Sequence, residues 1–252
     1  MKFADLDEAR AASGVRLVVV AGVPSAWSEA AKGLLIVKGI DALLVRHNPT
    51  NPAFREWTGA HNAPALMIDG EPPRTHWSDI LEAAERLGGR LSLVPQDPEQ
   101  KARMIGLAHA LLGENGLLYE ARLMVIHRGL ETEGKEGFSL RTGKYLAPKY
   151  GYSAERAIAA KPRVLAGLSR FAELLGESEY VFGANLTALD IYLAASMALF
   201  RMLPEDQCRG VHPSIRKAFD THDAELAAAV TPALVSHRQR IYERHIGLPI
   251  DV

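Results

Sequence analysis

Ser25 is the residue of this sequence whose type and position best fit catalytic chemistry. It follows an apolar, β-branched run that ends at Gly22 and precedes a segment with helical periodicity, so its hydroxyl would lie at the amino end of a helix. There a hydroxyl donor and the positive end of the helix dipole together stabilise an anion. Ser28 is the nearest alternative for this role. Serine is also a preferred N-cap, so a purely structural role for Ser25 stays open.

The spacing of Ser25 and Ser28 copies the Cys-x-x-Cys pattern of thioredoxin-like redox proteins, with both thiols missing. Without a thiolate nucleophile, disulfide exchange at this site is excluded. Cys208 is the only cysteine, so the chain cannot form an intrachain disulfide, and we interpret it as an inert or surface thiol.

The nine histidines do not indicate a metal site. His237 and His245 could share a helix face, but no third ligand is evident, so we expect no metal. The sequence also lacks a Gly-x-Gly-x-x-Gly loop after its first predicted strand, a Walker loop and a Gly-x-Ser-x-Gly elbow. These absences argue against dinucleotide, nucleoside triphosphate and α/β-hydrolase sites.

The composition is that of an ordinary globular protein, with 252 residues of which 48% are hydrophobic and 23% charged. The 29 basic and 30 acidic side chains give a formal net charge of −1, whereas nucleic-acid-binding proteins usually carry a basic surplus. The amino terminus carries acids where a signal peptide needs an apolar run, and no apolar run of about 18 residues occurs. We therefore expect a cytoplasmic protein with no nucleic-acid partner and no membrane contact.

Residues 15–90 alternate between strand and helix patterns. Strands are expected at 15–21, 41–46 and 65–68. One helix is expected from 25 or 26 to 38, a short one that runs through Trp57, and another at 77–87. The first strand, helix and second strand imply a right-handed parallel crossover. The turn Asp69–Gly70 is followed by Pro72 and Pro73, which cannot donate ladder hydrogen bonds, so at best a short edge strand follows it.

Beyond residue 98 the patterns are helical, with no strand among them. Helices are expected at 99–113, 116–131, 153–175, 188–203, 213–229 and 231–245. Pro162 should kink or interrupt its helix. Residues 131–152 are rich in Gly, Lys and Glu without periodicity, which predicts a mobile loop. The expected units are an extension at 1–14, an α/β domain at 15–90, a linker at 91–98, an all-helical domain at 99–245 and a tail at 246–252.

Three motifs in this order resemble the cytosolic glutathione transferase family, over about residues 15–245. They are Pro24–Ser28 with the helix end Lys38–Gly39–Ile40, Ala63–Pro64 before an apolar strand, and Phe182–Ile191 with its Gly-x-x-x-Thr-x-x-Asp pattern. The resemblance implies a thioredoxin-like α/β domain followed by an all-α domain, a ligand between them, a cis peptide before Pro64 and a symmetric homodimer. Thr187 and Asp190 fit a structural capping box, in which each side chain bonds the other residue's backbone N–H.

In the serine-type members that this region resembles, the hydroxyl at the position of Ser25 donates a hydrogen bond to the sulfur of glutathione. Lowering that thiol's pKa by about two units requires about 2.7 kcal/mol, which a charge-assisted hydrogen bond and a helix terminus supply together. The resemblance places the remaining glutathione contacts at Trp27, Ser28, Asn62, Ala63, Pro64, Thr75, His76 and Trp77.

The segment before the helix at 77–87 departs from the family. Its members carry an acidic residue and a serine there for the γ-glutamyl group, and these align either with Thr75 and His76 or with His76 and Trp77. Neither alignment supplies a carboxylate. Tyr119 and Arg122 share the helix face that the family turns toward its electrophile.

The leading hypothesis is a glutathione transferase-like enzyme, in which Ser25 activates the thiolate of glutathione, the cosubstrate, for attack on a small apolar electrophile. The alternative is a non-catalytic binding or scaffold protein of the same fold that has lost glutathione binding, which the missing carboxylate favours. A third possibility is an enzyme that recycles glutathione as a cofactor in dehalogenation or isomerisation.

Overall fold

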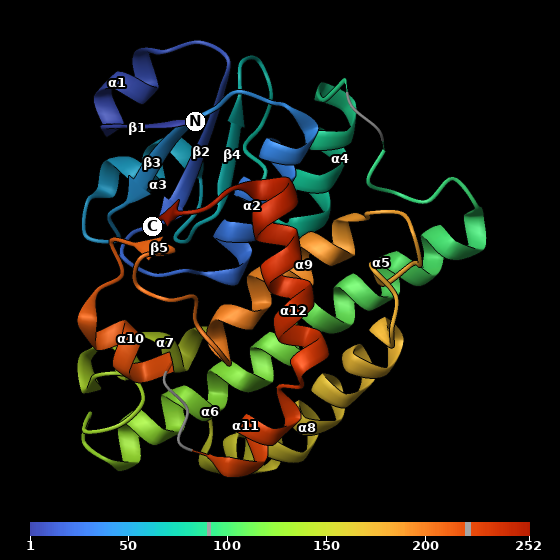
Figure 1. Ribbon diagram of the computed structural model, residues 1–252. Helices are drawn as coiled ribbons and strands as arrows, with labels where there is room; N and C mark the ends of the chain where they lie inside the picture. Colours follow the sequence, from blue (N-terminus) through green and yellow to red (C-terminus); the bar gives the residue numbers. More distant parts are fainter. Residues whose placement is uncertain (90–91, 220–222) are drawn as a thin grey trace.

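The computed structural model describes residues 1–89, 92–219 and 223–252, and places an α/β unit against a larger helical unit (Figure 1). Residues 90–91, where the α/β domain was expected to end and the linker to begin, lie outside the described residues. So do residues 220–222, inside the helix expected at 213–229.

The α/β unit is built on a four-stranded sheet with the strand order β1-β3-β2-β4. Its elements are β1 (Lys2–Ala4), α1 (Leu6–Ala11), β2 (Val15–Val20), α2 (Ala26–Lys38), β3 (Leu43–His47), α3 (Pro52–Thr58), β4 (Ala65–Ile68) and α4 (Trp77–Leu87). β2 and β3 are parallel, as the crossover predicts, and β4 is antiparallel to β2. Beyond the turn, the chain returns to the sheet only through an isolated bridge between Leu66 and Arg74, as expected after two prolines.

Residues 1–14 are not a separate extension, contrary to expectation. Lys2 to Ala4 pair in parallel with Leu43 to Val45, so that β1 forms an edge of the sheet, and α1 follows it. The guanidinium carbon of Arg46 lies 3.6 Å from the centre of the Phe3 ring, which adds a cation–π contact to this pairing. A strand of three residues is too short to show a two-residue periodicity, and its pairing with β3 decides its conformation.

The helical unit follows Pro98. Its elements are α5 (Pro98–Leu112), α6 (Leu117–Glu131), α7 (Leu140–Lys149), α8 (Ala154–Leu175), α9 (Ala188–Ser196), the 3₁₀ turn η1 (Met197–Leu199), β5 (Cys208–Arg209), α10 (Pro213–Phe219), α11 (Ala224–Ala229), α12 (Pro232–Ile241), the π-helical turn η2 (Tyr242–Ile246) and β6 (Ile250–Asp251). α8 runs without a break through Pro162, so the expected interruption is wrong.

The prediction of a mobile loop at 131–152 is also wrong, because α7 occupies Leu140–Lys149. Ser139 begins this helix by accepting a hydrogen bond from the backbone N–H of Thr142 at 3.3 Å. A Cβ at Gly143 would lie 3.3 Å from a methyl of Leu130, so α7 packs closely on α6. Tertiary packing therefore stabilises a helix whose own sequence contains Gly143 and Pro148.

Smaller differences concern the end of the chain. The helix expected at 188–203 ends at Ser196 before η1, and the one expected at 231–245 passes into η2 after Ile241. Two short parallel strands, β5 and β6, contradict the expectation of no strand in this half. Their pairing folds the expected tail, 246–252, back onto the protein, and Val252 is buried.

α9 lies at the centre of the molecule, with all nine of its residues buried. The predicted capping box begins it. The Asp190 carboxylate accepts hydrogen bonds from the backbone N–H groups of Thr187 and Val181, both at 2.8 Å, and from the Thr187 hydroxyl at 2.9 Å. His237 Nε2 of α12 lies 3.0 Å from the same carboxylate. Asp190 thus joins the start of α9, the preceding loop and α12.

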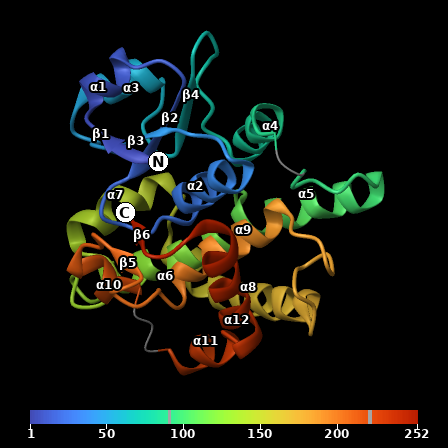
Figure 2. The same cartoon turned by 45° about the horizontal axis from the view of Figure 1, so that its top comes forward.

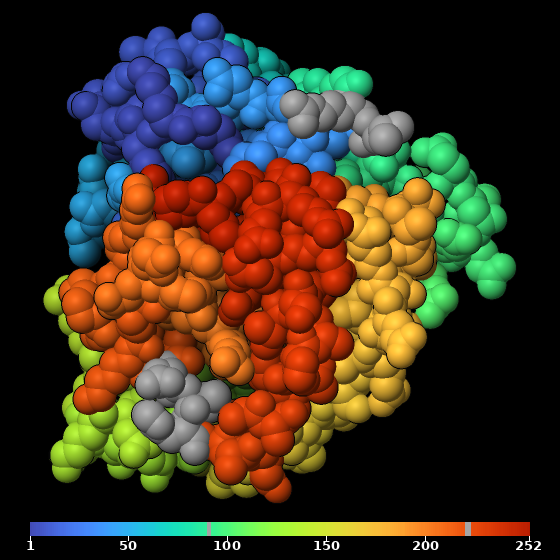
Figure 3. Space-filling view, viewed as in Figure 1, coloured from blue at the N-terminus to red at the C-terminus, as the bar shows by residue number. Residues whose placement is uncertain are grey.

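α2 packs directly on α9 and so joins the two units (Figure 2). A Cβ on Gly33 would lie only 2.6 Å from a methyl of Ile191, so this approach requires glycine. The Trp27 indole N–H donates to the Leu112 carbonyl at 2.9 Å, and Lys32 Nζ donates to the Asp251 carbonyl at 2.7 Å. Figure 3 shows the C-terminal residues, in red, reaching the blue α/β unit.

None of the helices in the described parts of the chain is both long and apolar enough to cross a bilayer.

Replacing Asp190 by Ala leaves the Thr187 and Val181 N–H groups without their acceptor in the interior. We expect the free energy of unfolding to fall by roughly 3–5 kcal/mol, as measured by urea denaturation. Thr187→Ser keeps both the hydroxyl and the N–H and serves as the control, with a change below about 1 kcal/mol. A loss in Asp190→Ala no larger than that of the control would contradict the role of this carboxylate.

Candidate functional site

A cleft of about 330 Å³ lies between the two units. The α/β unit lines it with Val20, Val23, Ser25, Trp27, Asn62, Ala63, Pro64 and Thr75, and the helical unit with Tyr119, Arg122, Phe138, Thr142, Tyr145, Leu146, Lys149, Tyr150 and Ile215. Eight of these residues are ones that the sequence singled out. We refer to this space as the cleft.

Ser25 lies at the start of α2, where its carbonyl accepts the Glu29 N–H at 2.8 Å. Its hydroxyl makes no capping hydrogen bond and no hydrogen bond to any other described residue. The residue is 5% exposed, and it lines the cleft. The hydroxyl is therefore available to a ligand beside the positive end of a thirteen-residue helix.

Ser28 has a different position. It is completely buried, it does not line the cleft, and its hydroxyl accepts the backbone N–H of Val20 at 3.1 Å. This bond ties α2 to the end of β2. The geometry therefore favours Ser25 over Ser28 as the residue that meets a ligand, because Ser28 does not reach the cleft.

Aromatic rings form one wall of the cleft. Trp27 and Tyr119 meet edge to face with ring centres 6.3 Å apart, and Tyr119 and Tyr150 lie 4.8 Å apart. Burial raises the pKa of both tyrosines, and the charge of Glu114 adds to the effect at Tyr119, whereas the positive charge of Arg122 opposes it at Tyr150. Both phenols therefore remain protonated donors at neutral pH.

Asn62, Ala63 and Pro64 form the opposite wall, before β4. The Ala63–Pro64 peptide is cis, as the resemblance implies. Thr75 lies close by on the segment before α4 and also lines the cleft. The side chains of Asn62 and Thr75 make no hydrogen bond to the described residues, so both are free to bind a ligand.

His76 and Trp77, two of the residues at which the resemblance places glutathione contacts, do not line the cleft. His76 caps α4, with its Nδ1 2.7 Å from the Ser78 hydroxyl. Trp77 is buried, and its ring meets that of Tyr192 of α9 edge to face at 5.9 Å. Of the two possible alignments of this segment, the structure favours the one that starts at Thr75, because only Thr75 reaches the cleft.

Two cations enter the cleft from the helical unit. Arg122 of α6 is buried, and its guanidinium carbon lies 4.9 Å from the centre of the Phe219 ring and 5.4 Å from that of Phe138. Lys149 ends α7. The residue as a whole is exposed, but its ammonium, 5.6 Å from the Tyr150 ring centre, is partly desolvated, and this, together with the charge of Arg122, lowers its pKa to about 8.

Sequence analysis missed the part of the cleft that α7 contributes. Thr142, Tyr145, Leu146 and Lys149 all line it, at the spacing i, i+3, i+4 and i+7 of one helix face. This spacing was the available signal. Leu146 is the one aliphatic residue of this stripe, so a search for apolar periodicity does not find it.

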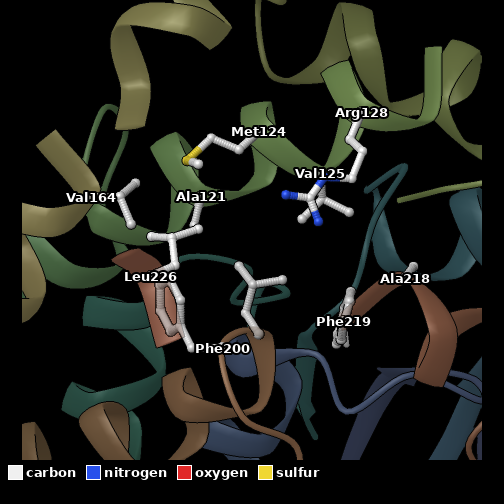
Figure 4. Close-up of a pocket in the computed structure, with 10 residues that line it drawn as sticks. Ala121, Met124, Val125, Arg128, Val164, Phe200, Ala218, Phe219 and Leu226 are labelled. Carbon is white, nitrogen blue, oxygen red and sulfur yellow. The ribbon is translucent and has the colours of Figure 1, made fainter. Parts of the chain in front are cut away.

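A second cavity lies deeper in the helical unit (Figure 4). Met124, Val125 and Arg128 of α6 lie on one side of it, and Ala218 and Phe219 of α10 on the other. Its volume is about 30 Å³, which matches a single water molecule rather than a substrate. The interdomain cleft is therefore the better candidate site.

The histidines and the cysteine that the sequence analysis considered are held in structural contacts or buried. Within residues 1–89, 92–219 and 223–252, no three His, Cys, Asp or Glu side chains are placed to hold a metal ion. The ring of His245 bonds the Tyr180 hydroxyl at 2.9 Å, while His237 meets Asp190. Burial raises the pKa of the Cys208 thiol to about 11, which keeps it protonated and unreactive.

No protein-family model matches the sequence, and neither does any curated protein. The fold is similar to solved glutathione S-transferases. One from Methylobacterium radiotolerans, in complex with glutathione sulfonate, is 19% identical with a TM-score of 0.62, covering 91% of each chain. A glutathione S-transferase domain-containing protein from Marinobacter aquaeolei is 16% identical with a TM-score of 0.64, covering 92% of this chain and 100% of that one.

A theta-class glutathione S-transferase from Xanthomonas axonopodis with glutathione bound is 17% identical with a TM-score of 0.55, covering 90% of this chain and 97% of that one. At these identities the likeness shows the fold. The chain has a thioredoxin-like α/β unit followed by the all-α unit of the glutathione transferase fold.

Lys149 should titrate at about pH 8 in the folded protein. The ¹³Cε resonance of Lys149, assigned by its loss in Lys149→Met, measures this midpoint, and Arg122→Met should raise it by removing a positive neighbour. Because this pKa is about 10.5 in the unfolded chain, the unfolded state binds more protons between the two values. The contribution of Lys149 to stability therefore increases as the pH rises from about 8 to above 10. A midpoint near 10.5 in the native protein would contradict the desolvation of this ammonium.

Proposed function

We propose that this protein is a glutathione transferase-like enzyme that activates the thiol of glutathione beside Ser25. The observation that carries the proposal is the unbonded Ser25 hydroxyl, which lines an interdomain cleft at the amino end of α2. In the glutathione transferase fold the α/β unit would hold glutathione and the helical unit the second substrate. A homodimer in the cytoplasm is part of this proposal.

The chemistry follows from the position of Ser25. The thiol of glutathione loses its proton to solvent, and the Ser25 hydroxyl donates a hydrogen bond to the resulting thiolate. The first-turn N–H groups of α2 add a positive potential. The sulfur then forms a bond to an electrophilic carbon, and the leaving group departs with the bonding electron pair.

The remaining cleft residues of the α/β unit would orient the tripeptide. The cis peptide leaves the backbone of Ala63 beside the cleft, where its N–H and carbonyl can pair with the peptide of glutathione. Asn62 can donate to the glycyl carboxylate, and the Thr75 hydroxyl to the γ-glutamyl carboxylate. Trp27 closes the side of the site between the two units.

One observation favours a second candidate, a non-catalytic binding or scaffold protein. None of the described residues that line the cleft is Asp or Glu, so no carboxylate is available for the γ-glutamyl ammonium of glutathione. A cleft that binds carboxylates but lacks a partner for the ammonium would hold glutathione weakly. Glutathione binding is therefore the point on which the two candidates differ.

A thermal-shift titration with glutathione separates the two candidates. At a free concentration of 100 times Kd, a ligand that binds only the native state adds about 2.7 kcal/mol to its stability, so we expect a rise in Tm that saturates. Glycine, which lacks the thiol and the γ-glutamyl group, is the control. A Tm that does not change up to millimolar glutathione would favour the binding protein.

Ser25→Ala should lower the rate of glutathione conjugation to a reactive aryl halide at least about tenfold, because the thiolate loses a charge-assisted hydrogen bond. The affinity for glutathione should stay nearly unchanged. Ser28→Ala is the matched control, since it removes a hydroxyl of the same helix that does not face the cleft, and it should affect stability more than the rate. An active Ser25→Ala protein together with an inactive, folded Ser28→Ala protein would assign the role to Ser28 instead.

A further inference from the structure

The helical wall of the cleft carries two positive charges and no negative one. Arg122 comes from the middle of α6 and Lys149 from the end of α7, and both line the cleft. No described carboxylate forms an ion pair with either side chain, and the positive charge of Arg122 lowers the pKa of Lys149. The charge of this wall is therefore not compensated within the described chain.

Arg122 is the more informative of the two cations, because it is only 6% exposed. The rings of Phe138 and Phe219 cover its guanidinium, but an aromatic face accepts no in-plane hydrogen bond. Its Nε is buried without a hydrogen-bond partner among the described residues. Two residues earlier on α6, the buried Glu120 shows the usual solution for a buried charge, since it pairs with Arg163 of α8 at 2.6 Å. Arg122 lacks such a partner and faces a space that can supply one.

The surroundings indicate the shape of that partner. The planar guanidinium presents parallel N–H groups, which match the two oxygens of a carboxylate. The rings of Tyr119 and Tyr150, 4.8 Å apart, provide an aromatic surface beside the cations. A molecule with an apolar or aromatic body and a carboxylate at one end would satisfy both features.

We propose that Arg122 and Lys149 form an anion subsite for the electrophilic substrate, which is then an amphipathic carboxylic acid with an apolar or aromatic body and not a neutral apolar molecule. The role of the bound acid as an electrophile rests on the proposed function, whereas the presence of the anion subsite does not. The sequence predicts an apolar, uncharged electrophile, whereas this inference assigns an electrophile that carries a carboxylate. Glutathione also carries carboxylates, so the test must distinguish the two sources of the anion.

The experiment is calorimetric titration of the full-length protein with 3-phenylpropanoate and with its neutral amide, 3-phenylpropanamide. The pair differs in charge and hardly in shape. The acid should bind at least about tenfold more tightly than the amide, because a hydrogen bond to a charged group is stronger than a neutral one. Arg122→Met should abolish this preference, and Lys149→Met should reduce it. Arg128→Met is the control, since Arg128 lies on the same helix but outside the cleft.

A second readout detects the anion at the subsite directly. The acid should raise the midpoint at which Lys149 titrates, because a bound carboxylate stabilises the ammonium, whereas the amide should leave it unchanged. The groups that act on Lys149 from neighbouring elements are Arg122 of α6 and His47 of β3, whose own pKa is lowered by burial and by the charge of Lys149. A purely structural role of Arg122 and Lys149 would give no difference between acid and amide.

Three outcomes would overturn the inference. The first is equal affinity for acid and amide, and the second is an equal loss of preference in Arg122→Met and Arg128→Met, which would indicate only a general effect of charge. The third is displacement of the acid by saturating glutathione, which would assign the subsite to the tripeptide. If the acid is preferred through Arg122 but glutathione neither binds nor reacts, the proposed function fails while the subsite stands.

Discussion

The packing of α2 against α9 is the constraint on which the site depends. Because Gly33 has no side chain, α2 and α9 approach closely at this point. Ile191 of α9 occupies the space that a Cβ at position 33 would need. α9 is in turn fixed at its start by the buried carboxylate of Asp190. Because α2 is a continuous helix from Ala26 to Lys38, this contact also fixes its amino end, and with it the position of Ser25 opposite the helical unit. A structural interaction in the core thereby determines the geometry of the cleft.

Three polar side chains of the cleft differ from the Asp190 carboxylate and the Ser28 hydroxyl of the core in lacking a hydrogen-bond partner. In the core the Asp190 carboxylate accepts the Thr187 hydroxyl, and the Ser28 hydroxyl accepts the Val20 N–H, so both oxygens have partners. In the cleft Ser25, Tyr119 and Arg122 make no side-chain hydrogen bond to the described chain. Polar groups that are left free on facing walls of one space are available to a ligand, and their charge is positive. The cleft therefore suits an anion, whether a thiolate, a carboxylate or both.

Much of the site could be predicted because its α/β half is encoded by local signals. The strand before Gly22 and the helix periodicity after it located Ser25, and the resemblance of Ala63–Pro64 to a family motif pointed to the opposite wall. The half of the cleft that the helical unit contributes was harder to predict from the sequence. Tyr119 and Arg122 lie on a regular helix, and the family resemblance indicated that their face meets the cleft. Lys149 and Tyr145 lie on a helix that contains Gly143 and Pro148 and is stabilised by its packing on α6.

The sequence alone determined the order of elements from β2 to α4, the capping box of α9 and the absence of a redox thiol beside α2, because each of these depends on residues that are close together in the chain. Only the tertiary structure decided that Ser25 faces the cleft while Ser28 bonds Val20, that Trp77 packs on Tyr192, and that two cations share one wall. These outcomes depend on contacts between residues far apart in sequence. Local periodicity specifies which face of a helix is buried, but it does not specify what lies opposite.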